Sequence, residues 1–331
     1  MNPLLSVVLP VRNGGGFLSQ AVESILSQTF ENLELLLVDD HSSDHAVSAI
    51  DQSDQRLKII RNRGRGVVDA SNTGFELSRG EFVARMDADD ISLPDRFRCQ
   101  LDYLDENPSI GISGCCVKFF SDNMIQGGLQ RYENWLNSVR SPEQIHQQIF
   151  IESPLPNPSL MFRQGALQRL DGYRNNQWPE DYDLLLRADA AGISMGKPEP
   201  LLLHWREHES RLTHTDSLYQ RQNFMQAKSH FLVQNRLKGR TVIIWGAGPT
   251  GRLMNDLLTA EGGKVAGFIE VHPRRIGGQK RGRPVWSMDK VKDLGDSLLL
   301  VAVGAAGARD EIAAYLQEHK KRPGQDYLFV A

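Results

Sequence analysis

Three carboxylates fall within four residues of this chain, at Asp87, Asp89 and Asp90, directly after an apolar run. Carboxylates this close repel one another, so the chain either turns them apart into water or holds a cation between them. Mg²⁺ and Mn²⁺ prefer oxygen ligands, and Mg²⁺ is often held by one or two carboxylates together with substrate phosphates. Because side chains alternate along a strand, Asp87 and Asp89 face the same side. The cluster therefore predicts a divalent-metal site, with a solvated turn before the helix that starts at Pro94 as the structural alternative.

The segments that must position these acids alternate between strand and helix patterns. Apolar runs predict strands over residues 4–11, 33–40, 57–62, 81–90 and 110–120. Helical spacing of apolar residues predicts helices over residues 17–26, 44–52 and 67–78, and from Pro94 to Asn107. This alternation predicts an α/β fold in which a mostly parallel sheet carries helices on both faces. Such sheets bind ligands at the carboxyl ends of their strands, where the Asp39-Asp40 pair and the Asp87–Asp90 cluster both fall.

The sequence predicts a division into residues 1–215, a helical connector over 216–238, and a small α/β domain over 239–331. Residues 121–158 are less regular and contain several prolines. Bulk composition is that of an ordinary globular protein, with 40% hydrophobic and 24% charged residues and a net charge of −3. Nothing in this charge favours nucleic acid as a partner.

The chain shows no apolar run long enough for a transmembrane helix, and residues 1–13 lack the basic start and cleavage site of a signal peptide. Its three cysteines, at positions 99, 115 and 116, suggest neither a disulfide framework nor a zinc site. We therefore expect a cytoplasmic protein, with peripheral contact at the inner face of a membrane as an option.

The third predicted domain opens with the full G-x-G-x-x-G pattern of Gly246, Gly248 and Gly251, between a strand and a helix. Glu270 ends the next predicted strand, near the place of a ribose-binding acid. The pattern resembles small Rossmann-like domains. Binding of NAD(P), binding of another nucleotide, and a purely structural role all stay open.

Several motifs taken together resemble the family 2 glycosyltransferases, whose catalytic domain has the GT-A fold. The similarity covers about residues 4–215 and rests on the order and spacing of VVLPVRN, SILSQTF, LLLVDDHSSD, SNTGFELSRGEFVARMDADD, NPSLMFR and WPEDYDLLLRADAAG. The resemblance implies a nucleotide-sugar donor, with UDP favoured, and a Mn²⁺ or Mg²⁺ ion across the strand ends. It also implies transfer to a hydroxyl of a glycan or lipid-linked acceptor, usually with inversion at the anomeric carbon, as in the synthesis of bacterial cell-surface polysaccharides.

The resemblance also assigns roles on the donor side. It places residues near the nucleotide or the donor as follows: Pro10, Arg12, Asn13, Asp40, Asn72 and Arg85. It makes Asp89 a metal ligand and Asp87 a contact to the ribose or metal, whereas Asp90 has no assigned chemistry and is expected to cap the turn. For Asp40 the structural alternative is an acid before a helix, and Asn72 and Arg85 have structural alternatives too.

On the acceptor side, the pair Glu180-Asp181 matches the family's acidic pair, with Asp181 as the general base. Both acids would also suit a helix N-terminus without doing chemistry. The segment HWREHESRL matches a tyrosine–arginine–x–histidine segment with Trp205 in place of tyrosine, so that Arg206 would meet a phosphate and His208 the diphosphate or metal. A core or surface role for His208 stays open.

Five cations lie in residues 274–283, which suggests either a solvated face or contact with anionic phospholipid headgroups. Two other functions stay open for the whole chain. The first is an NAD(P)-dependent oxidoreductase, against which stands the lack of a hydride-transfer constellation such as Tyr-x-x-x-Lys. The second is a non-catalytic sugar-nucleotide-binding protein, against which stand the intact acids Asp89 and Asp181.

Overall fold

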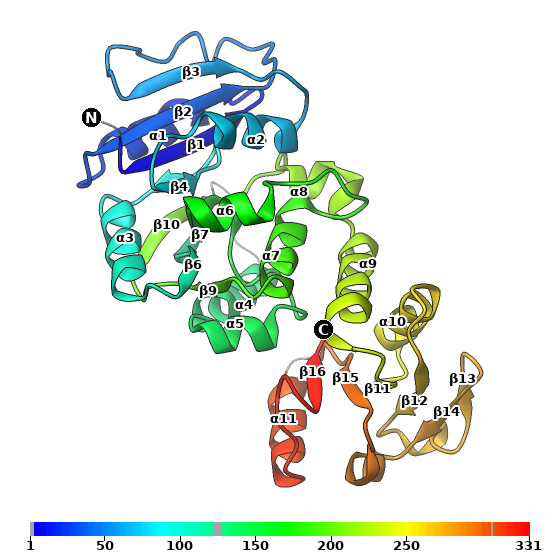
Figure 1. The fold of residues 1–331 in the computed structure, drawn as a ribbon. Coiled ribbons are helices and arrows are strands. Elements are labelled where there is room, and N and C mark those ends of the chain that lie inside the picture. Colours follow the sequence, from blue (N-terminus) through cyan, green and yellow to red (C-terminus); the bar gives the residue numbers. More distant parts are fainter. Residues whose placement is uncertain (1–2, 122–126, 306) are drawn as a thin grey trace. The chain divides into compact units, whose positions relative to one another are not determined.

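The computed structural model describes residues 3–121, 127–305 and 307–331. The chain forms two compact units (Figure 1). The first comprises Met1–Ile145 and Pro154–Ser217, and the second comprises His146–Ser153 and Leu218–Ala331. Residues 146–153 thus belong to the second unit, although they lie between two segments of the first. The division predicted from the sequence keeps them within residues 1–215.

The first unit is built on a seven-stranded sheet with the order β3-β2-β1-β4-β8-β6-β9. Its strands are β1 (Leu5–Val11), β2 (Leu33–Asp39), β3 (Leu57–Arg61), β4 (Phe82–Arg85), β6 (Ile110–Ser113), β8 (Met161–Arg163) and β9 (Ser194–Gly196). The strands β3, β2, β1 and β4 run parallel, and only β8 runs antiparallel to its neighbours β4 and β6. The predicted α/β fold with a mostly parallel sheet is confirmed.

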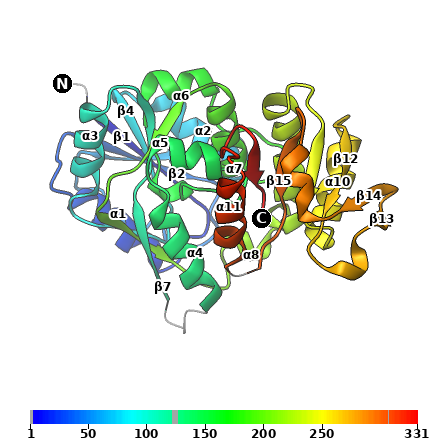
Figure 2. The same cartoon turned by 90° about the horizontal axis from the view of Figure 1, so that it is seen from below.

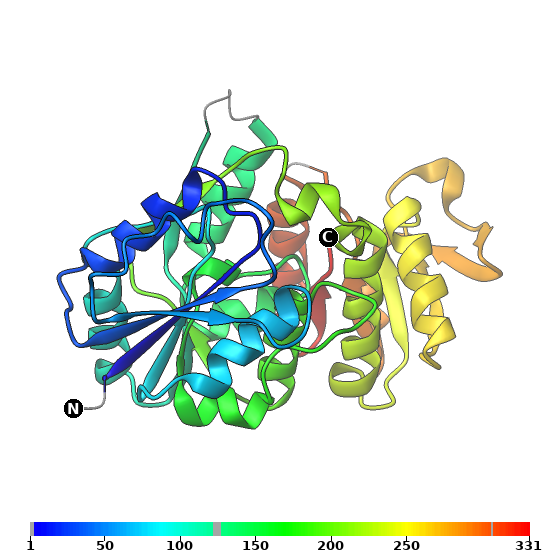
Figure 3. The same cartoon turned by 90° about the horizontal axis from the view of Figure 1, so that it is seen from above.

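Helices lie against both faces of this sheet because its central strands β1 and β2 bury apolar side chains on both sides. They are α1 (Phe17–Leu26), α2 (Val67–Leu77), α3 (Arg96–Glu106), α6 (Gln164–Leu170) and α7 (Glu180–Ala190). In Figure 3 the dark-blue α1 and the light-blue α2 lie on opposite sides of β1 and β2. The loops that follow β1, β2 and β4 therefore meet at one edge of the sheet.

A small second sheet of order β5-β10-β7 joins Ile91–Ser92, Leu201–Arg206 and Cys116–Phe120. The antiparallel pair β5–β10 ties the segment after the acidic cluster to the strand that carries Arg206. Helix α4 (Gly127–Ser138) lies alongside β7 (Figure 2), and α5 (Pro142–Gln148) follows. The stretch 121–158, expected to be irregular, thus contains two helices in its described part.

Two element predictions are wrong. The strand expected over 110–120 is two strands in different sheets, separated at Gly114 and Cys115. Gly114 packs closely on Leu155, since an added Cβ would lie 2.7 Å from a methyl group of that residue. The helix expected over 44–52 is a series of turns. Side chains bind its start: Asn13 Oδ1 accepts from the backbone N–H groups of Ser43 and Asp44, and Asp44 Oδ1 accepts from Ala46.

The second unit is an α/β fold built on a six-stranded sheet of order β13-β14-β12-β11-β15-β16. Its strands are β11 (Val242–Trp245), β12 (Val265–Ile269), β13 (Gln279–Lys280), β14 (Arg283–Trp286), β15 (Leu298–Val301) and β16 (Tyr327–Phe329), and its helices are α9 (Arg221–Phe231), α10 (Pro249–Ala260) and α11 (Ala308–Glu318). All pairs except β13–β14 are parallel. Across the described part of both units, no helix is long and apolar enough to cross a bilayer.

Candidate active site

The acidic cluster lies where β4 ends. Met86 is fully buried and donates its backbone N–H to Val8 of β1, so the chain leaves the sheet only after this residue. Asp87, Asp89 and Asp90 then form a tight turn in which carboxylate oxygens of all three residues lie within 4.8 Å of one another. The predicted strand over 81–90 is correspondingly shorter, because the turn begins at Asp87.

Asp87 has a buried cationic partner. The guanidinium of Arg85, only 2% exposed, donates through Nη1 to Asp87 Oδ1, and its Nε has no hydrogen-bond partner. A buried cation beside a carboxylate stabilises the ionised form of both groups. The Asp87 carboxylate is thereby held at the end of β4 by the ion pair with Arg85.

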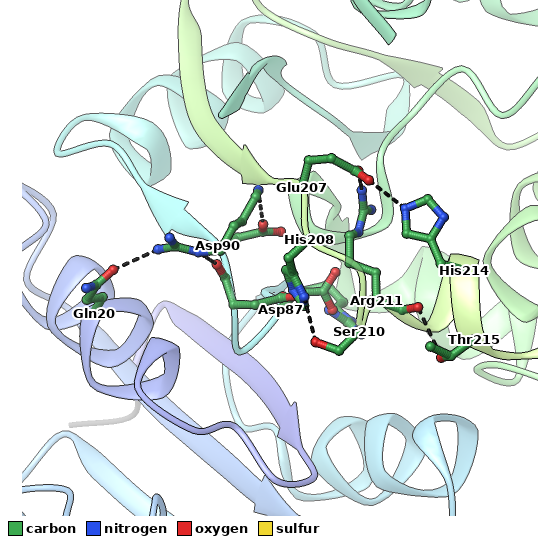
Figure 4. A network of polar contacts seen from close by, with 12 residues as sticks. Gln20, Asp87, Asp90, Glu207, His208, Ser210, Arg211, His214 and Thr215 are labelled. Atoms are coloured by element: carbon green, nitrogen blue, oxygen red, sulfur yellow. Dashed lines mark hydrogen bonds and ion pairs between the residues drawn. The ribbon is translucent and has the colours of Figure 1, made fainter. Parts of the chain in front are cut away.

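Asp89 pairs with His208, which comes from the segment that follows β10 (Leu201–Arg206). His208 Nε2 lies 2.8 Å from Asp89 Oδ2, and His208 Nδ1 lies 2.8 Å from Ser210 Oγ (Figure 4). Burial and the neighbouring Asp87 raise the pKa of Asp89, whereas the hydrogen bond to His208 lowers it. Residues separated by 119 positions in the chain are thus brought to one point.

Asp90 is the most deeply buried of the three acids. Its Oδ1 accepts a hydrogen bond of 2.7 Å from the backbone N–H of Arg206, and its Oδ2 is buried without a partner. Burial and the charges of Asp89 and Asp87 raise its pKa well above the usual value. Asp90 therefore joins the turn to β10 (Leu201–Arg206), a larger role than the simple turn cap that the sequence suggests.

The Arg206 side chain fills the space behind this turn. Its guanidinium lies over the rings of Phe17 and Phe120, 4.3 and 4.4 Å from their centroids. It donates through Nε to the carbonyl oxygen of Asp89 and through Nη2 to Gln20 Oε1, each at 2.7 Å (Figure 4). The Arg206 side chain is therefore buried, and the hydrogen bonds of its guanidinium are made to protein groups around the acidic turn.

The cluster fits a divalent cation. Three carboxylates and an imidazole offer the oxygen and nitrogen ligands that Mn²⁺ and Mg²⁺ accept. The partnerless buried Oδ2 of Asp90 and the raised pKa values of Asp89 and Asp90 show that negative charge is incompletely balanced in this turn. The side chains of Asp87, Asp89 and His208 are partly exposed, whereas Asp90 is buried, so the first three are better placed to hold such an ion.

Asp181 is the second residue of α7 (Glu180–Ala190), is half-buried, and accepts a hydrogen bond from the backbone N–H of Tyr182. Burial and the neighbouring Glu180 raise its pKa to about 7, and the charges of Asp87 and Arg85 also act on it. The tertiary structure therefore places Asp181 within electrostatic reach of Asp87 and Arg85.

The loop before α7 is held by a buried ion pair, Asp183 and Arg187, whose spacing in the sequence is that of an ordinary i,i+4 helix pair. Asp183 is 1% exposed, and its carboxylate accepts from Asn176, from Trp178 and, at 2.6 Å, from Arg187 Nε. Arg187 also donates to the carbonyl oxygens of Leu170 and Gly172. The pair thereby fixes the loop that leads to Asp181, and Trp178 holds the same loop by donating its indole N–H to Asp183.

Asn72 acts on the same loop from α2. Its side-chain amide makes two 2.9 Å hydrogen bonds to the backbone N–H and C=O of Tyr173. Tyr173 is buried, stacks on Phe75 and donates its hydroxyl to Asn157 Oδ1. Sequence reasoning missed Tyr173 and Asn157, since no local pattern marks a tyrosine that packs between distant segments.

The residues predicted to line the nucleotide lie at the ends of β1 and β2. Pro10 is buried within β1, whereas Arg12 and Asn13 are exposed just beyond it. Asp40 is 4% exposed: its carboxylate accepts from Asn62 Nδ2 and from the backbone N–H of Gly66, and lies 4.0 Å from Arg12 Nη1. Asn13, with φ of 55°, bonds residues 43 and 44 and so fixes the two loops against each other.

The glycine loop of the second unit has a packing explanation. An added Cβ at Gly251 would lie 1.8 Å from the carbonyl oxygen of Gly246, so the first turn of α10 requires a glycine there. The Glu270 carboxylate accepts from the backbone N–H groups of Val271 and His272 and pairs with Arg275 at 3.0 Å. These internal partners leave the expected NAD(P) or nucleotide role of Gly246, Gly248, Gly251 and Glu270 without support.

Comparison with known proteins gives consistent results. Residues 6–171 match the family model for glycosyl transferase family 2. A Haemophilus influenzae protein described as an uncharacterized glycosyltransferase is 27% identical over 64% of this chain and 69% of its own length. The amylovoran biosynthesis glycosyltransferase AmsE of Erwinia amylovora is 30% identical over 55% of this chain and 65% of its own length. The chain thus spans about two thirds of each relative.

Two solved structures share the fold. S. aureus TarS, residues 1–349 in complex with UDP-GlcNAc, superposes with a TM-score of 0.57 at 16% identity, over 78% of this chain and 72% of that one. The Pyrobaculum calidifontis mannosyltransferase PcManGT, in complex with GDP-Man and Mn²⁺, gives 0.50 at 20% identity, over 72% and 64%. With a family model that covers half of its residues, and with the acidic turn placed at the end of a central parallel strand, this chain belongs to glycosyl transferase family 2 and is a glycosyltransferase.

Proposed function

We propose that this glycosyltransferase transfers a sugar from a nucleotide-diphosphate donor, with UDP favoured, to a hydroxyl group of a glycan or lipid-linked acceptor, in a metal-dependent and inverting reaction. The observation that carries the proposal is Asp181, a carboxyl group with a pKa raised to about 7 on which the charges of Asp87 and Arg85 act. A general base works best when its pKa lies near the operating pH. The similarity to AmsE, an amylovoran biosynthesis glycosyltransferase, supports a role in bacterial cell-surface polysaccharide synthesis.

The donor side of the proposal rests on the acidic turn. Asp89 and His208 would hold a Mn²⁺ or Mg²⁺ ion, with Asp87 beside them in an ion pair with Arg85. When bound, the ion offsets the negative charge that develops on the leaving diphosphate. Arg12, Asn13 and Asp40 at the ends of β1 and β2 line the nucleotide, and Arg206 holds the acidic turn from behind through its bond to the carbonyl oxygen of Asp89. Glu180 contacts the substrate beside Asp181. The donors bound in the two solved structures, UDP-GlcNAc and GDP-Man, support a nucleotide-sugar substrate.

The acceptor side of the proposal rests on Asp181. Its carboxylate takes the proton of the acceptor hydroxyl as that oxygen forms a bond to the anomeric carbon. The bond from the anomeric carbon to the diphosphate oxygen breaks in the same displacement, and its electron pair leaves with the diphosphate. Because the nucleophile enters opposite the leaving group, the configuration at the anomeric carbon inverts. The buried pair Asp183–Arg187 fixes the loop before α7 and so keeps Asp181 oriented.

A first experiment tests the base. Asp181→Asn should reduce transfer by at least about a hundredfold, the lower end expected for general-base catalysis, while donor binding stays near that of the parent protein. The matched control is Asp105→Asn, the same charge change at an exposed position of α3, which should leave transfer unchanged. Strong residual transfer by Asp181→Asn would contradict the assignment. If the parent protein catalyses neither transfer nor donor hydrolysis while it binds the donor, a binding protein is favoured instead.

A second experiment tests donor and metal together. UDP-, GDP- and dTDP-sugars are screened by thermal unfolding with and without Mn²⁺, because a ligand that binds the native state raises the melting temperature. We expect a shift that needs both a UDP-sugar and Mn²⁺ and that disappears in Asp89→Ala. Equal shifts with and without Mn²⁺, or an unchanged response in Asp89→Ala, would show that the metal role is wrong.

A further inference from the structure

The second unit carries a short basic segment on its surface, residues 271–283, which we call the basic hairpin. It contains Arg274, Arg275, Lys280, Arg281 and Arg283, and no acidic residue. The segment runs from the end of β12 through a single 3₁₀ turn (Pro273–Arg275) into the antiparallel pair β13–β14. The chain as a whole has a net charge of −3, so this concentration of positive charge is local.

Only part of this charge is balanced by the protein. Arg275 pairs with Glu270 at 3.0 Å, and Arg281 pairs with Asp256 at 2.7 Å. The other three cations of the basic hairpin have no acidic partner among the residues that the structure describes. Three positive charges are therefore available to an outside partner.

The strand pairing of the basic hairpin brings two of these positive charges together. Lys280 and Arg283 lie directly opposite each other in the β13–β14 pair, and like charges at such positions destabilise a sheet. The two-residue turn between them places Arg281 at φ 52° and Gly282 at φ 70°. A non-glycine residue in that region is energetically unfavourable. Folding alone would therefore favour neutral or smaller residues at these positions. An anionic partner would reduce the repulsion between Lys280 and Arg283.

Apolar side chains accompany the charge. Val271 is 59% exposed and Ile276 is 37% exposed, and they are two of the five large hydrophobic residues exposed in the described part of the chain. They lie on either side of the 3₁₀ turn that carries Arg274. Exposed apolar residues next to cations suit a surface that is anionic at its face and apolar just beneath.

We propose that the basic hairpin binds the surface of an anionic phospholipid membrane. Arg274, Lys280 and Arg283 contact the headgroup phosphates, while Val271 and Ile276 reach the boundary with the acyl chains. Nucleic acid is disfavoured because residues 271–283 contain no Phe, Tyr or Trp that could stack on a base. This inference does not depend on the proposed function, since it concerns the second unit alone.

The test is co-sedimentation of the full chain with vesicles that contain neither donor nor acceptor. We expect binding to an equal mixture of phosphatidylcholine and phosphatidylglycerol, weak binding to phosphatidylcholine alone, and a loss of binding as salt is raised. The triple change of Arg274, Lys280 and Arg283 to Gln should weaken binding about a hundredfold, from roughly fivefold per cation. Val271→Ser with Ile276→Ser should weaken it further.

The matched control changes three other exposed cations of the second unit, Lys238, Lys264 and Lys320, to Gln. Removal of the same charge from this different surface should change vesicle binding little. Each variant is first shown to unfold at the temperature of the parent protein, so that lost binding reports on the surface and not on folding. Three results would overturn the proposal: no binding of the parent protein to anionic vesicles, equal binding to neutral ones, or an equal loss in the control variant.

Discussion

Arg206→Lys tests whether this arginine positions the acidic turn or contacts the donor phosphate. The arginine donates through Nε to the carbonyl oxygen of Asp89, and its backbone N–H donates to Asp90. Lysine keeps the positive charge near the rings of Phe17 and Phe120, but its single ammonium cannot reproduce the planar fork that reaches both Asp89 and Gln20. The substitution therefore loosens the turn without removing a charge.

The magnitude follows from these contacts. A hydrogen bond from a charged donor contributes about 1.5–3 kcal/mol. Loss of the bond to Asp89 should lower the free energy of unfolding by a similar amount, and the melting temperature should fall accordingly. Residues that orient metal ligands typically change metal affinity 10- to 100-fold when mutated, so we expect the apparent affinity for Mn²⁺ in the presence of UDP to fall by roughly that factor.

The assay separates the two roles by measuring UDP affinity with and without Mn²⁺. If Arg206 positions the turn, UDP affinity in a chelator stays at the parent level and only the gain on adding Mn²⁺ shrinks. If Arg206 binds a phosphate, UDP affinity falls in the chelator as well, and that result would refute the positioning argument. Arg163→Lys is the matched control, because Arg163 lies over the ring of Phe82 and donates to backbone carbonyls of Ile110 and Leu104. It should lower the melting temperature without changing the Mn²⁺ response.

Three further predictions concern a proton, an ion pair and a glycine loop. Because burial and Glu180 raise the pKa of Asp181 to about 7, its basic form is lost as pH falls, so kcat/KM should decline about tenfold per pH unit below that value; a flat profile would contradict the base assignment. Asp183→Asn leaves the buried arginine at position 187 without its carboxylate and should lower the free energy of unfolding, measured in urea, by about 3–5 kcal/mol; an unchanged urea midpoint would argue against this pair. Gly251→Ala places a Cβ 1.8 Å from a carbonyl oxygen and should lower the free energy of unfolding by about 1–3 kcal/mol. Gly248→Ala places its Cβ in open space and should change that free energy by no more than about 0.5 kcal/mol. Equal melting temperatures of the two variants would disprove the packing explanation.

Local patterns were enough to predict the strands of the parallel sheet and the acidic turn at the end of β4. The patterns failed where contacts between distant residues decide the backbone. The run 110–120 is interrupted near its middle only by Ser113 and Gly114, yet it divides there between two sheets, and Gly114 packs on Leu155 from another segment. Residues 44–52 have helical spacing but form turns, and Asn13 accepts from the backbone N–H of Asp44, 31 positions away.

The sequence alone predicts which residues would bear the chemistry, because Asp87, Asp89 and Asp181 lie in short motifs whose residue types limit what they can do. Only the tertiary structure decided how these residues are held. The pairing of Asp89 with His208 and the contacts of Arg206 join positions more than one hundred residues apart, and no local periodicity encodes such pairs. Likewise, an i,i+4 spacing looks the same in sequence whether the pair is solvated or buried, and it is burial that makes Asp183 and Arg187 an anchor of the site. The free energy of an ion pair depends on the surrounding dielectric, which is a property of the folded chain and not of its sequence.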